Sequence, residues 1–196
     1  MSQAVAWKQL MLRSVKKNSS LPSAKYIQVA TVKNNGRPAN RTVVFRGFLE
    51  DTTKLTFVTD SRSAKIDDIG HTPFSEICWY FPITREQFRL GGQLSVISKE
   101  SGVEEELKLR QAAWARMSSG GQEQFLWPTP GKPRQGVRDL VQGPVPGDQD
   151  PPPETFCLVV MDVEEVDHLQ LKGNRRHRYW KSTQIEGGWE EEETNP

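Results

Sequence analysis

The spacing of hydrophobic and polar positions changes several times along the chain, and each change predicts an element. Apolar residues recur at helical intervals in residues 2–17, which predicts a helix that packs on a sheet. β-Branched and aromatic residues then dominate a series of short runs, and this composition is typical of strands. We expect these strands at 25–33, 39–48, 54–59, 75–81, 86–98, 155–161 and 164–171. Two further helices are expected, a short one within 60–72 and a longer one over 103–117.

Two glycine-containing stretches indicate how the strands are connected. Asn34-Asn35-Gly36-Arg37 is typical of a hairpin turn, because Asn and Gly tolerate positive φ at both central positions. Gly91 and Gly92 lie inside the fifth expected strand and indicate a bulge or the close approach of another backbone. The strands follow one another largely in hairpin order, with helices at the start, middle and periphery. This pattern predicts a mainly β fold with an antiparallel barrel rather than a parallel α/β sheet.

Residues 118–155 differ from the rest of the chain. Proline and glycine crowd this segment, which ends in the run Pro151-Pro152-Pro153, and they predict a long irregular loop. A loop of this length inside a compact domain is more often a functional flap or an interface arm than filler. The length of 196 residues suits one domain. We therefore expect a single domain over residues 1–196 with an insertion at about 118–155.

Composition and charge narrow the classes of function. A net charge of +1 gives no overall field that favours nucleic acid or a membrane surface. Charged residues interrupt the apolar positions of the first 17 residues, so we expect neither a secretory signal nor a membrane span. Cys78 and Cys157 lie in apolar runs and are expected to be reduced core residues of a cytoplasmic protein, with a disulfide between them as the alternative. The histidines and cysteines show no metal-ligand spacing, and no Rossmann or P-loop motif is present.

Residues 39–48 combine two arginines with a run of strand-forming residues. In a regular strand, Arg41 lies on one face with Val43, and Arg46 lies on the other with Val44. An arginine at each end of an apolar strand is costly unless its guanidinium reaches water or an anion. Two interpretations stay open: both side chains extend into solvent, or they clamp an anion such as a phosphate.

A second group of polar residues follows the third expected strand. Its members are Ser61, Arg62, Ser63 and Lys65. They lie at the start of the short helix, where free backbone N–H groups can bind an anion. Hairpin order makes the second and third strands neighbours, so we expect this group beside Arg41 or Arg46. Together they predict a pocket for a phosphate monoester, and the alternative is a scattered set of solvated charges.

Four motifs follow one another in a characteristic order. They are Asn40-Arg41-Thr42-Val43-Val44-Phe45-Arg46-Gly47-Phe48, Phe57-Val58-Thr59-Asp60-Ser61-Arg62-Ser63-Ala64-Lys65, Trp79-Tyr80-Phe81-Pro82 and Arg85-Glu86-Gln87-Phe88-Arg89. Their order resembles the pyridoxamine 5′-phosphate oxidase family, and within it the branch of oxidase-related FMN-binding proteins. The resemblance covers about residues 25–98, weakens over 99–155 and returns in part near 165–180. It implies a six-stranded split barrel with flanking helices that binds FMN at the interface of a homodimer.

The resemblance also implies which residues contact the flavin. By position in the family motifs they are Arg41, Thr42, Val43, Val44, Arg46, Val58, Thr59, Arg62, Ser63, Lys65, Gln87, Arg89 and Arg178. Arg41 and Arg46 would bracket one flavin, although the family has a lysine at the second position. The family's phosphate-binding arginine falls on Ala64, and Arg62 stands two residues earlier as its substitute. Gln87 and Arg89 would orient the ring, whose pyrimidine edge offers both donors and acceptors.

The C-terminal part departs from the family pattern. Leu171 and Lys172 stand where the family has a tryptophan and a glutamine. Arg175 and His177 reproduce an R-x-H motif and are the candidate substrate-side residues. The substrate-facing tyrosine, arginine and serine of the family have no counterparts in 110–135. No catalytic residue is assigned, because the flavin itself carries out the redox chemistry.

Three functions stay open at this point. The first is an FMN-dependent oxidoreductase that resembles pyridoxamine 5′-phosphate oxidase and transfers a hydride from a small substrate. The second is a non-catalytic FMN-binding or carrier protein, which the broken substrate motif favours. The third is an oligonucleotide-binding barrel that uses residues 175–178 with Tyr179 and Trp180 for stacking. The near-neutral charge disfavours the third, so no nucleic-acid partner is expected.

Overall fold

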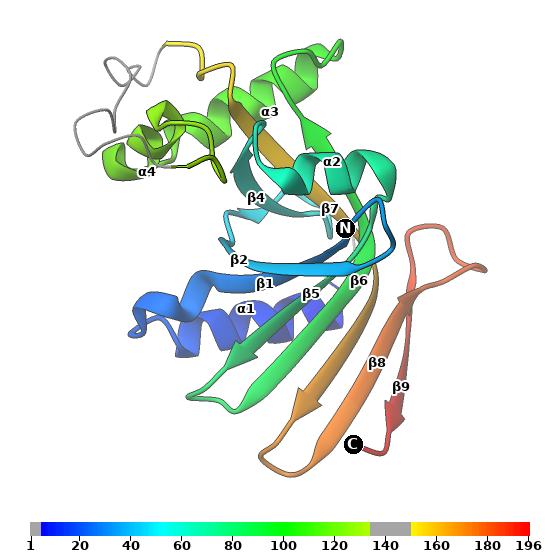
Figure 1. Ribbon diagram of the computed structural model, residues 1–196. Helices are drawn as coiled ribbons and strands as arrows, with labels where there is room; N and C mark the ends of the chain where they lie inside the picture. The colour runs from blue at the N-terminus through cyan, green and yellow to red at the C-terminus, as the bar shows by residue number, and fades with distance from the viewer. Residues whose placement is uncertain (1–4, 134–149) are drawn as a thin grey trace.

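Antiparallel strands form one continuous sheet in the computed structural model, which describes residues 5–133 and 150–196 (Figure 1). The strands are β1 (Tyr26–Val32), β2 (Pro38–Val44), β3 (Gly47–Phe48), β4 (Leu55–Asp60), β5 (Phe74–Phe81), β6 (Glu86–Ile97), β7 (Phe156–Gln170), β8 (Arg175–Lys181) and β9 (Trp189–Thr194). The main path runs β2–β1–β5–β6–β7–β4–β3, and β7 also pairs with β8, which pairs with β9. The chain crosses from β2 at one end of this path to β3 at the other, which brings the two ends of the sheet together.

The helices lie at the ends and over one face of the sheet. They are α1 (Ala6–Lys17), α2 (Ala64–His71), α3 (Glu104–Ala115) and α4 (Ser119–Glu123), with 3₁₀ turns η1 (Pro22–Lys25) and η2 (Gln124–Leu126). Figure 1 shows α2, α3 and α4 in the upper half of the view and the hairpin β8–β9 at the lower right. The α1 side chain Trp7 is fully buried and contacts Phe48 and Trp189 edge-on, with ring centroids 6.0 and 5.2 Å away. No helix in the described ranges is both long and apolar enough to cross a membrane.

Alternation along the strands gives the sheet an inner and an outer face. On β1, Ile27, Val29 and Thr31 are buried, and the residues between them are more exposed. The inner face carries the main core, which α1 completes. On the outer face, Arg89 of β6 lies in register with Cys78 of β5. Cys78 is partly exposed there, so it is not the core residue that its apolar neighbours predicted; Cys157 is buried, and both thiols are free.

The predicted irregularity at Gly91 and Gly92 is a β-bulge, because the register between β6 and β7 shifts between these two residues. A Cβ on Gly92 would lie 2.1 Å from the carbonyl oxygen of Asp162, and one on Gly91 would lie 2.8 Å from the side chain of Glu165. Both distances are far below normal contact. The prediction of a bulge or a close backbone approach is confirmed, and glycine permits that approach.

The predicted mainly β, antiparallel fold class is confirmed. The seven strand ranges expected become six strands of the main path, because the last two form β7; six is also the number that the resemblance implies for the barrel. The structure adds the two-residue β3 and the hairpin β8–β9. The acidic residues near the C-terminal end of the chain contribute β9. Its glutamates have cross-strand partners on β8, such as Arg175, whose Nε lies 2.8 Å from Glu193. These partners offset the low strand propensity of glutamate.

Two other predicted boundaries are wrong. The strand expected over 39–48 ends at Val44, after which the chain bends and the Arg46 N–H donates to the Thr56 carbonyl at 2.9 Å. The two strands expected at 155–161 and 164–171 are one strand, because pairing with β6 continues across the bulge. The short helix expected within 60–72 is α2 and lies inside that range.

Part of the predicted irregular segment at 118–155 is helical. The Ser118 hydroxyl accepts a hydrogen bond from the Gly121 N–H and caps α4, and a second apolar cluster joins Trp114 and Phe125 to Phe156. The buried Arg110 guanidinium donates to the Phe156 carbonyl at 2.9 Å and to the carbonyls of the preceding prolines, which anchors the return to β7. The rest of the predicted loop, residues 134–149, lies outside the described residues.

Candidate functional site

Polar side chains converge where β4 ends and α2 begins, and we call this group the α2 cluster. Its members are Arg41, Thr59, Ser63 and Lys65. The Lys65 ammonium donates to Thr59 Oγ1 at 2.7 Å and to Ser63 Oγ at 2.9 Å. Arg41 reaches the cluster from the inner face of β2, where its guanidinium donates to Thr31 Oγ1 at 2.6 Å and to Asp68 at 3.3 Å. The strand with the two arginines and the start of the short helix therefore meet at Arg41.

The connection between β4 and α2 leaves donors free for a ligand. Ser63 is the N-cap residue of α2 and has an extended backbone, but its hydroxyl makes no capping hydrogen bond. The hydroxyl faces Lys65 and Thr59 instead, and the two hydroxyl oxygens lie 3.2 Å apart. The first-turn N–H groups of α2 thus receive no side-chain cap, and such groups bind anions readily.

Positive charge in the α2 cluster is only partly neutralised. Burial and the nearby Arg41 guanidinium lower the pKa of Lys65, against the opposing effect of Asp60 and Asp68. The hydrogen bonds of Lys65 go to hydroxyl groups, and Arg41 shares Asp68 with the Thr31 hydroxyl. Two neighbouring cations with hydroxyl groups between them favour an anion that accepts several hydrogen bonds, such as a phosphate.

Arg62 follows the cluster in sequence but is engaged elsewhere. Its guanidinium donates to both carboxylate oxygens of Asp60, at 3.0 and 2.7 Å, and to the Trp127 carbonyl at 2.9 Å. The hydrogen bonds to Asp60 raise the pKa of Arg62. This arginine ties the end of η2 to the start of α2. Its charge is matched by Asp60, so it is not a free substitute for the missing phosphate arginine.

Arg46 lies apart from Arg41, beyond the end of β2. It lines a pocket of about 250 Å³ together with Lys25 and Arg116. Among the other residues of the strand motifs, Val43 and Val58 pack on apolar clusters. Thr42 and Val44 face outward. Within the strand motif, Arg41 alone belongs to the α2 cluster.

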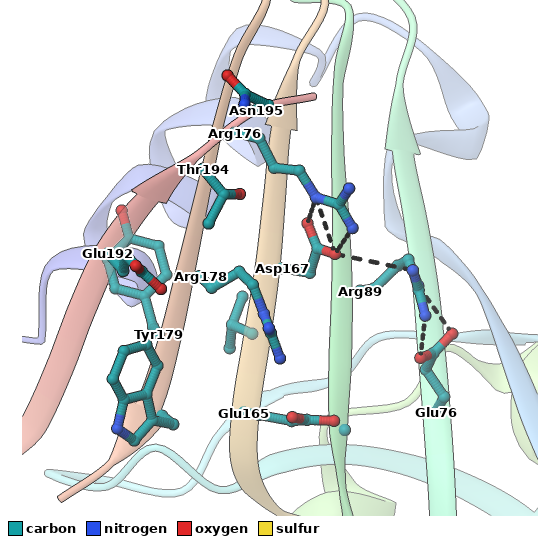
Figure 2. A pocket seen from close by; sticks show the side chains of 13 residues that line it. Glu76, Arg89, Glu165, Asp167, Arg176, Arg178, Tyr179, Glu192, Thr194 and Asn195 are labelled. Atoms are coloured by element: carbon teal, nitrogen blue, oxygen red, sulfur yellow. Dashed lines mark hydrogen bonds and ion pairs between the residues drawn. The ribbon is translucent and has the colours of Figure 1, made fainter.

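A second arginine-rich region lies on the outer face of β5 to β8, in a cleft of about 650 Å³ that we call the outer cleft. Figure 2 shows four of its side chains in a row of alternating charge, the charge row: Glu76, Arg89, Asp167 and Arg176. Arg89 donates to the two Glu76 oxygens at 3.0 and 2.8 Å and lies 3.7 Å from Asp167. Asp167 also accepts from Arg176 Nε at 3.0 Å. The two carboxylates of the charge row therefore neutralise its two arginines.

Gln87 and Arg178 share the outer face but lie outside the charge row. Alternation on β6 places Gln87 on the same face as Arg89. Arg178 is exposed and has no hydrogen bond or ion pair to any other residue in the described part of the chain (Figure 2). The structure thus brings Gln87, Arg89 and Arg178 to one face, with Arg178 as its free cation.

Arg175 and His177 point the opposite way. Arg175 donates to Glu193 at 2.8 and 3.2 Å, and His177 stacks on Tyr179 with ring centroids 6.3 Å apart. Tyr179 belongs to the main core, so these residues lie on the inner face of β8. The expected substrate-side pair and the expected flavin arginine Arg178 therefore do not converge within one chain.

The partners of these arginines were not predicted from the sequence. Thr31 occupies an inward position among core residues, and a buried hydroxyl needs a hydrogen-bond partner, so this residue carried a signal. It donates to Asp68 at 2.7 Å. The outer partners Glu76 and Asp167 gave no comparable signal, because strand neighbours distant in sequence decide which charges meet.

The donors present fit the two ends of FMN. The α2 cluster supplies two cations, two hydroxyls and uncapped backbone N–H groups, which suit a phosphate monoester. The outer face supplies an amide and a free guanidinium, which suit the polar edge and the negative charge of a flavin ring.

The chain is similar to known proteins along its whole length. Residues 4–98 match the family model described as pyridoxamine 5′-phosphate oxidase, FMN-binding domain. Pyridoxine/pyridoxamine 5′-phosphate oxidase 2 of Arabidopsis thaliana is 40% identical over 193 residues, which cover 97% of this chain and 96% of the relative.

Solved structures show the same architecture. A pyridoxamine 5′-phosphate oxidase-related, FMN-binding protein of Nostoc punctiforme superposes with a TM-score of 0.93 at 45% identity and full coverage of both chains. PhzG of Burkholderia lata superposes with a TM-score of 0.70 at 16% identity, covering 100% of this chain and 94% of that one. The latter likeness concerns the fold alone.

Proposed function

Because this chain belongs to the pyridoxamine 5′-phosphate oxidase family of FMN-binding proteins, we propose that it is an FMN-dependent oxidoreductase. Its cofactor is FMN. When bound, FMN supplies the redox chemistry, taking a hydride from a small substrate and passing electrons to an acceptor. The observation that carries the proposal is the α2 cluster, where Lys65 and Arg41 lie together with hydroxyl partners and incomplete neutralisation.

The residues of the chain divide the work of holding FMN. Arg41, Lys65 and the first turn of α2 bind the phosphate, and the Thr59 and Ser63 hydroxyls hold the Lys65 ammonium in place by accepting its hydrogen bonds. Gln87 and Arg89 orient the ring from the outer face, and Glu76 fixes the plane of the Arg89 guanidinium through two hydrogen bonds. Arg178, which is exposed and has no partner in the described part of the chain, would supply positive charge beside the ring.

We also propose that the protein works as a cytoplasmic homodimer with FMN at the interface. The separation of Arg178 from Arg175 and His177 supports this arrangement. A site that uses both sets has to draw them from two subunits, because one β8 presents them on opposite faces. A single chain offers only half of such a site.

The second candidate is a non-catalytic protein that binds or carries FMN. The position of Arg178 on the opposite face of β8 from Arg175 and His177 favours this candidate if the protein works as a monomer. In a monomer, Arg175 and His177 cannot join Arg178 in one substrate pocket. The oligonucleotide-binding alternative is weakened, because Arg178 is the one arginine of residues 175–178 without a partner in the described part of the chain. Arg175 and Arg176 are ion-paired, and Tyr179 is 4% exposed, so neither free charge nor a stacking surface is offered at these positions.

Two measurements test the proposal. The purified protein should show the visible absorbance of bound flavin, and peroxide should form when pyridoxamine 5′-phosphate is added. Bound flavin without turnover of this or other small substrates would favour the carrier. A colourless protein that does not take up added FMN would contradict both readings.

A further inference from the structure

Asp68 of α2 adjoins the α2 cluster, and it is not among the flavin-contact residues that the family motifs imply. It stands three positions after Lys65, so the two side chains lie on the same side of the helix. Asp68 is 6% exposed and accepts a hydrogen bond from β1, whereas the neighbouring Asp67 is exposed. The helix therefore turns a carboxylate as well as an ammonium toward the sheet, at the point where Arg41 arrives from β2.

A closed set of hydrogen bonds joins Asp68 to Arg41 and to Thr31 of β1. Thr31 is 2% exposed, and its hydroxyl donates to Asp68 Oδ2 at 2.7 Å. The same hydroxyl accepts a hydrogen bond from Arg41 Nη1 at 2.6 Å, and Arg41 Nη2 donates to Asp68 Oδ2 at 3.3 Å. These three contacts fix the guanidinium relative to both β1 and α2.

One edge of the Arg41 guanidinium stays open. Nη1 lies within hydrogen-bond distance of the Val29 and Ala39 carbonyls as well, at 3.2 and 3.4 Å. In the ranges that the structure describes, Nε donates to no other residue, and Nη2 donates only to Asp68. A guanidinium carries five N–H donors in a rigid fork, so the edge formed by Nε and Nη2 keeps the two-point geometry that suits a phosphate.

Electrostatic repulsion alone would disfavour a carboxylate at this place. The charge of Asp68 repels a phosphate and offsets part of the charge of Arg41 and Lys65. The two cations also repel each other, because Arg41 lowers the pKa of Lys65, after the larger effect of burial. In the ligand-free protein this repulsion pushes the guanidinium toward water, and the hydrogen bonds to Asp68 and Thr31 oppose that movement.

We propose that Asp68 is a positioning residue that acts through Arg41 and sets the preference of the site for FMN over unphosphorylated riboflavin. It holds the open edge of the guanidinium ready for the phosphate, so that binding does not have to order a freely rotating arginine. This role rests on the proposed function, because it requires that the α2 cluster hold the phosphate of FMN.

Fluorescence titration of the full chain, freed of flavin, with FMN and with riboflavin tests this role, because the two ligands differ only in the phosphate. Asp68→Ala should weaken FMN binding about 10-fold, less than the loss of Arg41 itself, and should leave riboflavin binding unchanged. In the Arg41→Ala background, Asp68→Ala should cause no further loss, since its effect passes through that arginine. Thr31→Val should also weaken FMN binding, and Thr31→Ser, which keeps the hydroxyl, should retain it.

Asp67→Ala is the matched control, because it removes an exposed carboxylate one position earlier on the same helix, and it should bind FMN normally. The role of Asp68 is overturned if Asp68→Ala tightens FMN binding, as simple repulsion predicts, or leaves it unchanged. It is also overturned if FMN and riboflavin weaken equally, as a merely structural role predicts, or if the loss is the same with and without Arg41. An unmodified protein that binds no FMN would contradict the proposed function itself.

Discussion

The α2 cluster and the outer cleft are both rich in arginine or lysine, but they handle charge in opposite ways. In the α2 cluster, Lys65 is bonded to hydroxyl groups and lies near Arg41, and these cations have one directly bonded carboxylate between them. In the outer cleft, each arginine of the charge row meets a carboxylate on a neighbouring strand. The first region leaves positive charge partly unneutralised, which is why we propose it as the ligand site, and the second uses charge to link neighbouring strands.

This difference shows that basic residues alone do not identify an anion site. The sequence places arginines in both regions, and only the positions of Asp60, Asp68, Glu76 and Asp167 separate the two cases. The pKa shifts follow the same division. That of Lys65 falls, mainly through burial, whereas that of Arg89 rises, mainly through its hydrogen bonds to Glu76.

The largest effect is expected from removing both cations of the α2 cluster. The double variant Arg41→Ala/Lys65→Ala should lose about 1000-fold in FMN affinity, since each charge-assisted contact to a phosphate is worth roughly 2 kcal/mol. Fluorescence titration of the apoprotein with FMN measures this loss. Lys54→Ala removes an exposed lysine nearby in sequence and should bind FMN normally. Unchanged FMN affinity in the double variant would show that residues outside the α2 cluster bind the phosphate.

The buried pair His168 and Glu86 extends the comparison to the interior. His168 is fully buried, its Nε2 lies 3.4 Å from Glu86, and burial lowers its pKa from 6.5 to about 4. Between pH 6.5 and pH 4, His168 binds a proton in the unfolded chain but not in the folded chain. The free energy of unfolding is therefore highest, as far as His168 is concerned, above pH 6.5, and it falls by up to about 3 kcal/mol as the pH drops toward 4.

Denaturant unfolding across this pH range checks the contribution of His168. His168→Phe keeps the ring stacked on Phe88 and should flatten the dependence on pH. His71→Gln changes an exposed histidine and should keep the slope of the unmodified protein. Equal slopes for His168→Phe and the unmodified protein would show that His168 is not the titrating group.

A smaller effect is expected at the centre of the charge row. Asp167→Asn should lower the free energy of unfolding by about 1 kcal/mol, because it weakens hydrogen bonds to Arg176 and leaves Arg89 with one carboxylate. FMN affinity should change by less than about threefold, since a charged hydrogen bond to the cofactor is not removed. If Asp167→Asn lowered FMN affinity as much as the double variant of the α2 cluster does, the proposed difference in role between the two regions would be wrong.

The smallest effect is expected at the exposed end of the charge row. The side chains of Glu76 and Arg89 are each 43% exposed, so Glu76→Gln should cost below about 1 kcal/mol, and less in high salt. Thermal unfolding at low and high ionic strength measures it. A larger loss of stability that does not depend on salt would mean that Glu76 and Arg89 are buried in the homodimer.

The elements were predictable from the sequence where local pattern decides them. The hairpin turn, the inward and outward alternation of β1 and the bulge at Gly91 and Gly92 all follow from residue types within a few positions. The sequence did not predict that residues 155–161 and 164–171 form one strand, because the continuity of β7 depends on its pairing with β6. The acidic β9 was missed for the same reason, since its glutamates are stabilised by residues of β8.

The candidate site divides in a similar manner. Ser63 and Lys65 were placed correctly at a helix start, a local property of the sequence. Strand alternation predicted that Arg41 and Arg46 lie on opposite faces. The bend at Phe45 was not foreseen, because it is held by hydrogen bonds from Phe45 to Lys25 and from Arg46 to Thr56, which are distant in sequence. The family resemblance implies one flavin for both arginines, and this stays a prediction.

The two-residue period of β8 has a consequence for how such proteins diversify. Sliding this hairpin strand by a single residue along β7 would exchange Arg176 and Arg178 for Arg175 and His177 on the outer face. A one-residue insertion or deletion near the turn at Gly173 is therefore a possible route to a different set of ligand-facing groups without any substitution. For protein engineering, the length of that turn is therefore a second variable beside the identity of the arginines, because it sets which residues of β8 face outward.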